Sequence, residues 1–183
     1  FLKMGVWGFN PAYYLGSTIF GLPIEEWMFF LFIPYACIFM HYSLLELFPN
    51  FSYNKKQTKY ITILLSCYFL VSLILNHDKW YPLINYLLAI LLLITVYSQN
   101  KNLLRSYYKT FLVMLIPFVI VNGVLTGFGI TDQVVWYDNS ENSGIRFFTI
   151  PIEDATYAFT MILSTLFITD FLEKRKVSKI MIL

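Results

Sequence analysis

The chain has 183 residues, of which 58% are hydrophobic and only 13% are charged, and its mean hydropathy is +0.62. A soluble domain carries about 25% charged residues, so the composition excludes an ordinary water-soluble protein and predicts an all-α, polytopic membrane helix bundle. The net charge of +2 is small, and we expect no nucleic acid as a partner.

Five apolar stretches have about the length needed to cross a bilayer as helices. We expect these spans at roughly 23–45, 60–76, 81–98, 107–126 and 151–172. Helices are expected because a spanning segment in lipid must satisfy its own backbone hydrogen bonds. Pro23, Pro82 and Pro151 lie at or near the starts of three spans, where the missing N–H of proline does no harm.

Basic residues are distributed unevenly between the two faces that five spans define. Three lie on the face of the first residue: Lys3, Lys79 and Arg146. Ten lie on the opposite face: Lys55, Lys56, Lys59, Lys101, Arg105, Lys109, Lys174, Arg175, Lys176 and Lys179. The positive-inside rule therefore predicts that the C-terminus lies in the cytoplasm. We expect a multi-pass protein of the cell inner membrane, in contact with membrane lipid.

Two acidic motifs open the first and the last span. Pro-Ile-Glu-Glu at Pro23–Glu26 recurs as Pro-Ile-Glu-Asp at Pro151–Asp154. Ionisable residues at membrane helices are functional candidates, and two helices that run in the same direction can bring their first turns to one site. The candidate catalytic residues are therefore Glu25, Glu26, Glu153 and Asp154.

A Val-Trp pair precedes each motif, and the separations from Trp7 to Pro23 and from Trp136 to Pro151 differ by one residue. We therefore expect a parallel internal repeat. Residues 1–50 form the first repeat, 51–80 a linking span and 81–183 the second repeat. Two spans precede the Val-Trp pair in the second unit, so we expect seven spans in the full protein, two of them upstream of Phe1.

The motifs also have a plainer interpretation as helix starts, where carboxylates favour the positive end of the helix dipole. Both interpretations stay open, because an acid at a helix start can also serve a site. Adjacent helical residues point about 100° apart, so only one acid of each pair can face the bundle centre squarely. The sequence does not say which.

Of two carboxyl groups in an apolar cavity, one can act as the proton donor and the other as the proton acceptor. Burial and a second carboxylate favour the protonated form of one acid, while its ionised neighbour accepts a proton. Aromatic faces stabilise positive charge, although any single ring could instead face lipid. The rings near the motifs are Trp27, Phe29, Phe30, Phe32, Tyr35, Phe147, Phe148, Tyr157 and Phe159.

Two further polar residues lie near the second motif. Asn122, inside the fourth span, could orient a carboxyl group or bond to a neighbouring helix. Arg146 could pair with an acid, but a solvated loop position is the favoured interpretation. The sequence contains no GxGxxG nucleotide loop and no metal-ligand spacing around Cys37 or Cys67, so we expect no cofactor and no metal.

The segments Gly5–Asn10, Pro23–Phe30 and Pro151–Tyr157 resemble the lycopene cyclase domain of carotenoid biosynthesis, the small membrane type found as two subunits or as one fused chain. The resemblance implies an intramolecular lyase or isomerase that cyclises the linear ends of lycopene to β-ionone rings without net redox change. It implies a lipophilic polyene substrate and allows contacts with other carotenoid-pathway enzymes. Glu25 and Glu153 are the expected acid/base pair, with Glu26 and Asp154 in support.

Three other functions compete with this interpretation. A related carotenoid-tailoring enzyme, such as a hydratase, would share the first protonation and let water quench the cation. A proton-coupled membrane transporter would use the acids as a relay, but its acids should lie mid-span at broken helices. A non-catalytic membrane subunit would use the acid pairs only to cap helices.

Overall fold

The computed structural model describes the backbone of residues 1–180 and the side chains of residues 1–175. Five helices hold most of this chain: Ile24–Leu47 (α1), Lys55–Leu75 (α2), Trp80–Gln99 (α3), Lys101–Leu125 (α4) and Ile152–Ile180 (α5). Each contains a stretch long and apolar enough to cross a membrane. The structure therefore confirms the all-α bundle of five candidate spans and fits a multi-pass membrane protein.

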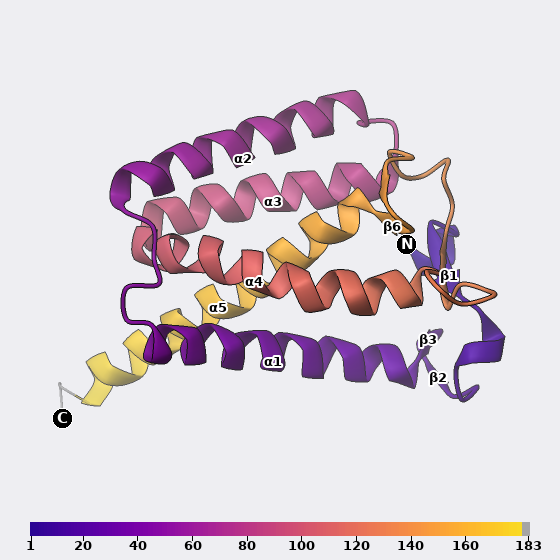
Figure 1. Ribbon diagram of the computed structural model, residues 1–183, viewed down its shortest axis with the longest axis horizontal. Coiled ribbons are helices and arrows are strands. Elements are labelled where there is room, and N and C mark those ends of the chain that lie inside the picture. The colour runs from indigo at the N-terminus through magenta and orange to yellow at the C-terminus, as the bar shows by residue number, and fades with distance from the viewer. Residues whose placement is uncertain (181–183) are drawn as a thin grey trace.

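Successive helices run up and down the bundle, so that α1, α3 and α5 all begin at the same end (Figure 1). We call this the motif end, because Pro23–Glu26 and Pro151–Asp154 lie there. The opposite end carries the starts of α2 and α4. Two acidic motifs that lie far apart in the sequence are thus brought to one end of the molecule.

Helices α2 and α4 begin several residues before the apolar stretches that hydropathy predicts, because side-chain caps extend their first turns. Asn54 Oδ1 accepts from the amide of Gln57 at 2.8 Å, and Gln57 Oε1 accepts from the amide of Asn54 at 3.0 Å. This capping box adds a polar turn before the apolar part of α2. Asn100 Oδ1 caps α4 by accepting from the amide of Leu103 at 3.3 Å. Both additions lie at the end opposite the motifs.

Short strands cover the motif end in three antiparallel pairs. Trp7–Phe9 (β1) pairs with Val135–Tyr137 (β4). Thr18–Ile19 (β2) and Leu22–Pro23 (β3) form a hairpin that leads into α1. The hairpin of Arg146–Phe147 (β5) and Ile150–Pro151 (β6) leads into α5. Two 3-10 turns, Leu2–Met4 and Pro11–Tyr13, flank β1.

The hairpins before α1 and α5 share one geometry. Phe20 and Phe148, at the two turns, both have φ of 54°, a left-handed conformation that bulky residues seldom adopt. The amide of Ile24 donates to the carbonyl of Ser17 at 3.1 Å, and the amide of Ile152 donates to the carbonyl of Ile145 at 3.1 Å. All these positions are related by the same interval in sequence.

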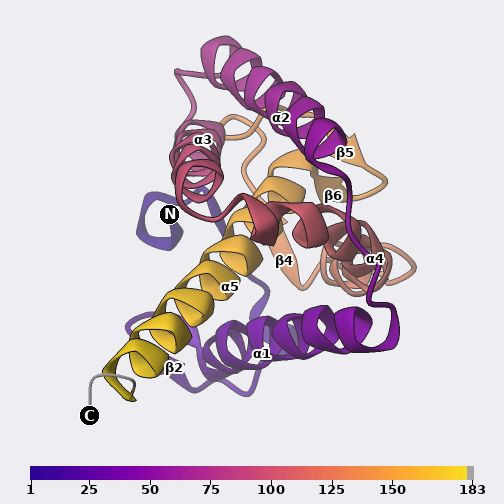
Figure 2. The same cartoon turned by 90° about the vertical axis from the view of Figure 1, so that its left-hand side faces the viewer.

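The hydrophobic core lies where α3, α4 and α5 meet, around side chains such as Leu93, Leu104 and Leu163. Helix α1 lies below this core in both views (Figures 1 and 2) and is far less embedded, with only Pro34 and His41 buried. Polar contacts attach α1 near its C-terminal end.

Candidate active site

A cavity of about 290 Å³ lies between α1, α4 and α5. Its wall on α1 includes side chains at helical spacing, among them Phe29, Phe30, Ile33, Cys37 and Met40. The cavity follows α1 from Glu26 to Met40, a length of about 21 Å at the rise of an α-helix. Most of its lining is hydrocarbon, and its polar groups gather at the motif end.

Glu26 and Asp154 both line this cavity, one from each acidic motif. Glu26 is half-buried, whereas Asp154 keeps only 4% of its surface exposed. Both carboxyl groups belong to the first turn of their helix. The structure therefore brings the second acid of each motif to one apolar chamber, where the charge of Asp154 would be costly without partners.

Three donors surround the Asp154 carboxyl group. The hydroxyl of Tyr81 donates to Oδ1 at 2.6 Å, and the hydroxyl of Tyr137 donates to Oδ2 at 2.8 Å. Nδ2 of Asn122 also donates to Oδ2, at 2.9 Å. An ionised carboxylate only accepts hydrogen bonds, so three donors match the anion better than the neutral acid. Asn122 thus orients a carboxyl group and joins two helices through the same bond.

The ribbon of β1 and β4 closes the motif end of the cavity. Alternate strand residues point to one face, and Trp7, Phe9, Val135 and Tyr137 all line the cavity. Gly8 pairs with Trp136 on the other face, where a Cβ on Gly8 would overlap the indole ring. The ribbon therefore depends on a glycine at this close approach.

Tyr137 connects the two acids electrostatically. Burial raises the pKa of its phenol well above the usual value, and the charges of Asp154 and then Glu26 raise it further. The hydroxyl therefore remains a proton-bearing donor to Asp154. Tyr81 has the same role from α3. The sequence analysis missed both tyrosines, although Tyr137 directly follows the Val-Trp pair of the second unit.

The first acids of the motifs, Glu25 and Glu153, occupy a different environment. Glu25 Oε1 accepts from the amide of Leu15 at 2.9 Å, and Glu153 Oε1 accepts from the amide of Ser143 at 2.7 Å. Each donor lies ten residues upstream. Oε2 of each carboxyl is buried without a partner in the described residues. Neither residue lines the cavity, so both carboxyls hold loops rather than face the chamber.

The aromatic residues near the motifs separate into three groups. Phe29, Phe30 and Tyr157 line the cavity, and Phe159 is buried in the core. The others are exposed on the outside of the bundle: Trp27, Phe32, Tyr35, Phe147 and Phe148. Of the rings near the motifs, those that line the cavity therefore come from one face of α1 and from the second turn of α5.

Arg146 takes part in the loop structure and does not contact an acid. It donates to the carbonyl of Thr149 at 2.6 Å and to Oδ1 of Asn139 at 2.8 Å. Its guanidinium also lies 5.8 Å from the centre of the Tyr137 ring. Within the described residues, no group of three or more His, Cys, Asp or Glu side chains could hold a metal ion.

The fold and the site together define a multi-span helical bundle with carboxyl groups at one end of an apolar cavity. The family model described as Lycopene cyclase matches residues 1–45 and 78–172, which is most of the chain. The chain therefore belongs to the lycopene cyclase family. The match does not cover residues 46–77, the segment that contains α2. No curated protein and no solved structure matches the chain.

Proposed function

We propose that this protein is a membrane lycopene cyclase, an intramolecular lyase or isomerase that closes β-ionone rings at the linear ends of lycopene. The single observation that carries the proposal is the pairing of Glu26 and Asp154 at the polar end of an otherwise apolar cavity. The family membership supports the substrate class. A hydrocarbon chain in the cavity would present its end to both carboxyl groups.

The two acids have complementary environments. The three donors around Asp154 favour its carboxylate, which is a proton acceptor. Glu26, beside phenylalanine rings, suits the neutral acid that donates a proton. Glu26 protonates the terminal double bond, and the next double bond attacks the resulting carbocation to close the ring. Asp154 then removes a proton from the ring, which leaves an isomer of the substrate.

The cavity favours ring closure over capture of the cation by water. Phe29, Phe30 and Tyr157 line the cavity, and an aromatic ring beside a positive charge is worth about 0.5–2 kcal/mol. The carboxylate of Asp154 adds an opposite charge at the site where the proton leaves. After each turnover Asp154 loses its proton to solvent and Glu26 regains one from solvent, so the reaction consumes no acid overall.

Glu25 and Glu153 act as positioning residues in this proposal. Each bonds to a loop amide upstream of its helix and thereby sets the direction of the acid that follows it. This assignment exchanges the roles expected from the sequence, where Glu25 and Glu153 were the principal pair. The exchange rests on the cavity, which Glu26 and Asp154 line and the other two acids do not.

The matching hairpins support an internal parallel repeat. Residues 1–50 and 81–183 would be the two repeat units, and 51–80 the linking span. The shared turn geometry of Phe20 and Phe148 and the equivalent bonds of Glu25 and Glu153 favour this division. The family match leaves out 46–77, which is most of the proposed linker.

The proposed enzyme lies in the cell inner membrane, surrounded by lipid, with its C-terminus in the cytoplasm. The support is the excess of lysine and arginine at the end opposite the motifs. Lycopene partitions into the same membrane, so the enzymes that make it are the natural partners. The site would then lie toward the non-cytoplasmic side.

Expression in cells that accumulate lycopene, followed by pigment analysis, tests the proposal. We expect cyclic carotenoids, and in deuterated water one solvent deuterium per ring from the first protonation. Acyclic hydroxylated pigment would indicate a hydratase, and movement of a solute without pigment change would indicate a transporter. Unchanged lycopene from well-expressed, membrane-inserted protein would contradict any role in pigment chemistry.

A further inference from the structure

A second hollow lies along the seam between α1 and α5. It is lined by α1 from Phe30 to Ile38 and by Tyr157, Met161 and Thr165 of α5. Phe30, Tyr157 and Met161 also line the cavity that holds the acids. These three side chains therefore form a shared wall, one residue thick, between the cavity and the hollow. We call the hollow the seam groove.

The cavity is too short for a whole linear carotenoid. Such a polyene is about as long as the hydrocarbon core of a bilayer is thick, roughly 30 Å. The cavity follows α1 for only about 21 Å. If one end of the polyene reaches Glu26, the other part of the chain must leave the cavity.

The ends of the cavity do not offer that exit. The β1–β4 ribbon lies across the motif end. Beyond Met40, at the other end, His41 Nδ1 lies 3.0 Å from Thr110 Oγ1, and both residues are buried. Neither of these two residues lines the cavity, whose wall on α1 ends at Met40. The shared wall is where a second hollow adjoins the cavity.

The seam groove has the chemistry that a hydrocarbon chain requires. Leu31 and Tyr35 are 66% and 69% exposed on its outer side, where lipid would surround them. The hydroxyl of Thr165 donates to the carbonyl of Met161 at 2.7 Å, so it requires no polar ligand. The groove runs for about 12 Å along α1 from Phe30 to Ile38.

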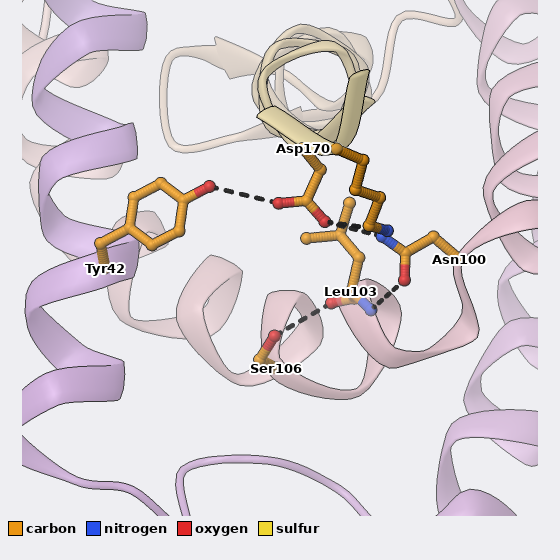
Figure 3. A network of polar contacts seen from close by, with 6 residues as sticks. Tyr42, Asn100, Leu103, Ser106 and Asp170 are labelled. Atoms are coloured by element: carbon orange, nitrogen blue, oxygen red, sulfur yellow. Dashed lines mark hydrogen bonds and ion pairs between the residues drawn. The ribbon is translucent and has the colours of Figure 1, made fainter. Parts of the chain in front are cut away.

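A polar contact bounds the groove at its end farther from the acids. The hydroxyl of Tyr42 donates to Asp170 Oδ1 at 3.3 Å and joins α1 to α5 just beyond Ile38 and Thr165 (Figure 3). Asp170 Oδ2 accepts from Nδ2 of Asn100 at 2.7 Å. Among the described residues, the side-chain hydrogen bond between α1 and α5 thus lies beyond the groove, and none crosses the seam along it.

We propose that the seam groove is a second subsite, which binds the part of the polyene that extends beyond the cavity. The proposal rests on the proposed function and adds the route by which the chain reaches it. The substrate enters sideways from the lipid, between Phe30 on α1 and Tyr157 and Met161 on α5. One end then lies at the acids while the remainder stays in the groove.

Binding of two polyenes to purified protein in lipid nanodiscs tests the proposal. One is acyclic lycopene, and the other is an acyclic polyene of half that length, which the cavity can hold alone. Ile38→Trp and Thr165→Trp each fill the groove from a different helix. Leu112→Trp, on an exposed part of α4 and outside both hollows, is the matched control.

We expect both groove variants to weaken lycopene binding about tenfold, the equivalent of roughly two buried methylene groups. Their affinity for the short polyene should match that of the parent, and the control variant should bind both polyenes as the parent does. Retained binding of the short polyene shows that the variants are folded. Equal losses for both polyenes, or no loss for lycopene because lipid occupies the groove, would overturn the subsite. If the parental protein binds neither polyene, the proposed function fails with it.

Discussion

Glu153 accepts a hydrogen bond from the backbone amide of Ser143, across the hairpin that precedes its own helix, at 2.7 Å. Glu25 has the same relationship to Leu15 in the first half of the chain. Successive helical residues point about 100° apart, so an acid that faces the loop turns its neighbour toward the bundle. The two carboxyls of each motif therefore lie in different surroundings, one bonded to a loop amide and the other lining the cavity.

The loop contact of Glu153 predicts a stability difference between two substitutions. Glu153→Gln keeps an oxygen for the Ser143 amide and should preserve the hairpin. Glu153→Leu removes the acceptor and should lower the free energy of unfolding by about 1–3 kcal/mol, because a partly buried N–H loses its partner. Thermal unfolding in detergent measures both. Equal stability of the leucine variant and the parent would show that the contact contributes nothing.

The hydrogen bond from Tyr137 to Asp154 predicts a loss of rate. Tyr137→Phe removes one of three donors to the carboxylate, a bond to a charged group worth about 1.5–3 kcal/mol, and should slow cyclisation about 10–100-fold. Tyr157→Phe is the control, because this ring lines the same cavity but its hydroxyl is not among the three donors to Asp154 in the described residues. Steady-state rates with lycopene in nanodiscs compare the two. A larger loss in the control would refute the assignment.

The close approach of Gly8 to Trp136 predicts that even a methyl side chain at position 8 lowers the stability of the protein. Gly8→Ala places a methyl group against the Trp136 indole and should destabilise the ribbon by about 1–3 kcal/mol, the usual cost of overpacking. Gly123→Ala is the control, because a Cβ there meets only an ordinary contact with Phe128. Tryptophan fluorescence during thermal unfolding reports on the ribbon. A Gly8→Ala protein with parental stability and emission would be inconsistent with the close approach.

The contacts of Asp170 should stabilise the end of the bundle opposite the acids. Asp170→Ala removes acceptors from Tyr42 and Asn100, as Figure 3 shows, and should cost about 1–3 kcal/mol without changing the acid site. The contact with Lys174, at 3.9 Å, is exposed and should contribute little. Lys174→Ala is therefore the control. Comparable losses of stability in the two variants would contradict this ranking.

Hydropathy was sufficient to predict five helices and their directions, because lipid requires every spanning backbone to satisfy its own hydrogen bonds. The starts of α2 and α4 were placed too late, since the caps at Asn54 and Asn100 lie in polar sequence that carries no hydropathy signal. The short strands were not anticipated. Pairs of two or three residues depend on contacts between segments far apart in the chain, as in β1 with β4.

The repeated motif indicates the four acids as candidates, but it does not indicate which acid of each pair lines the cavity. Which of two adjacent helical residues faces inward depends on how the helix is rotated, and the loop bonds of Glu25 and Glu153 set that rotation. The partners of Asp154 illustrate the same limit. Asn122 stood out as a polar residue inside an apolar span, whereas Tyr81 and Tyr137 were two among fourteen tyrosines.

Pigment analysis of four single variants in lycopene-accumulating cells tests the central claim most directly. Glu26→Gln and Asp154→Asn should abolish ring formation, because each removes a proton donor or acceptor from the cavity. Glu25→Gln and Glu153→Gln should still yield cyclic carotenoids at equal protein levels in the membrane. Cyclic product from Glu26→Gln or Asp154→Asn would contradict the account. So would a loss of cyclic product that is confined to Glu25→Gln and Glu153→Gln.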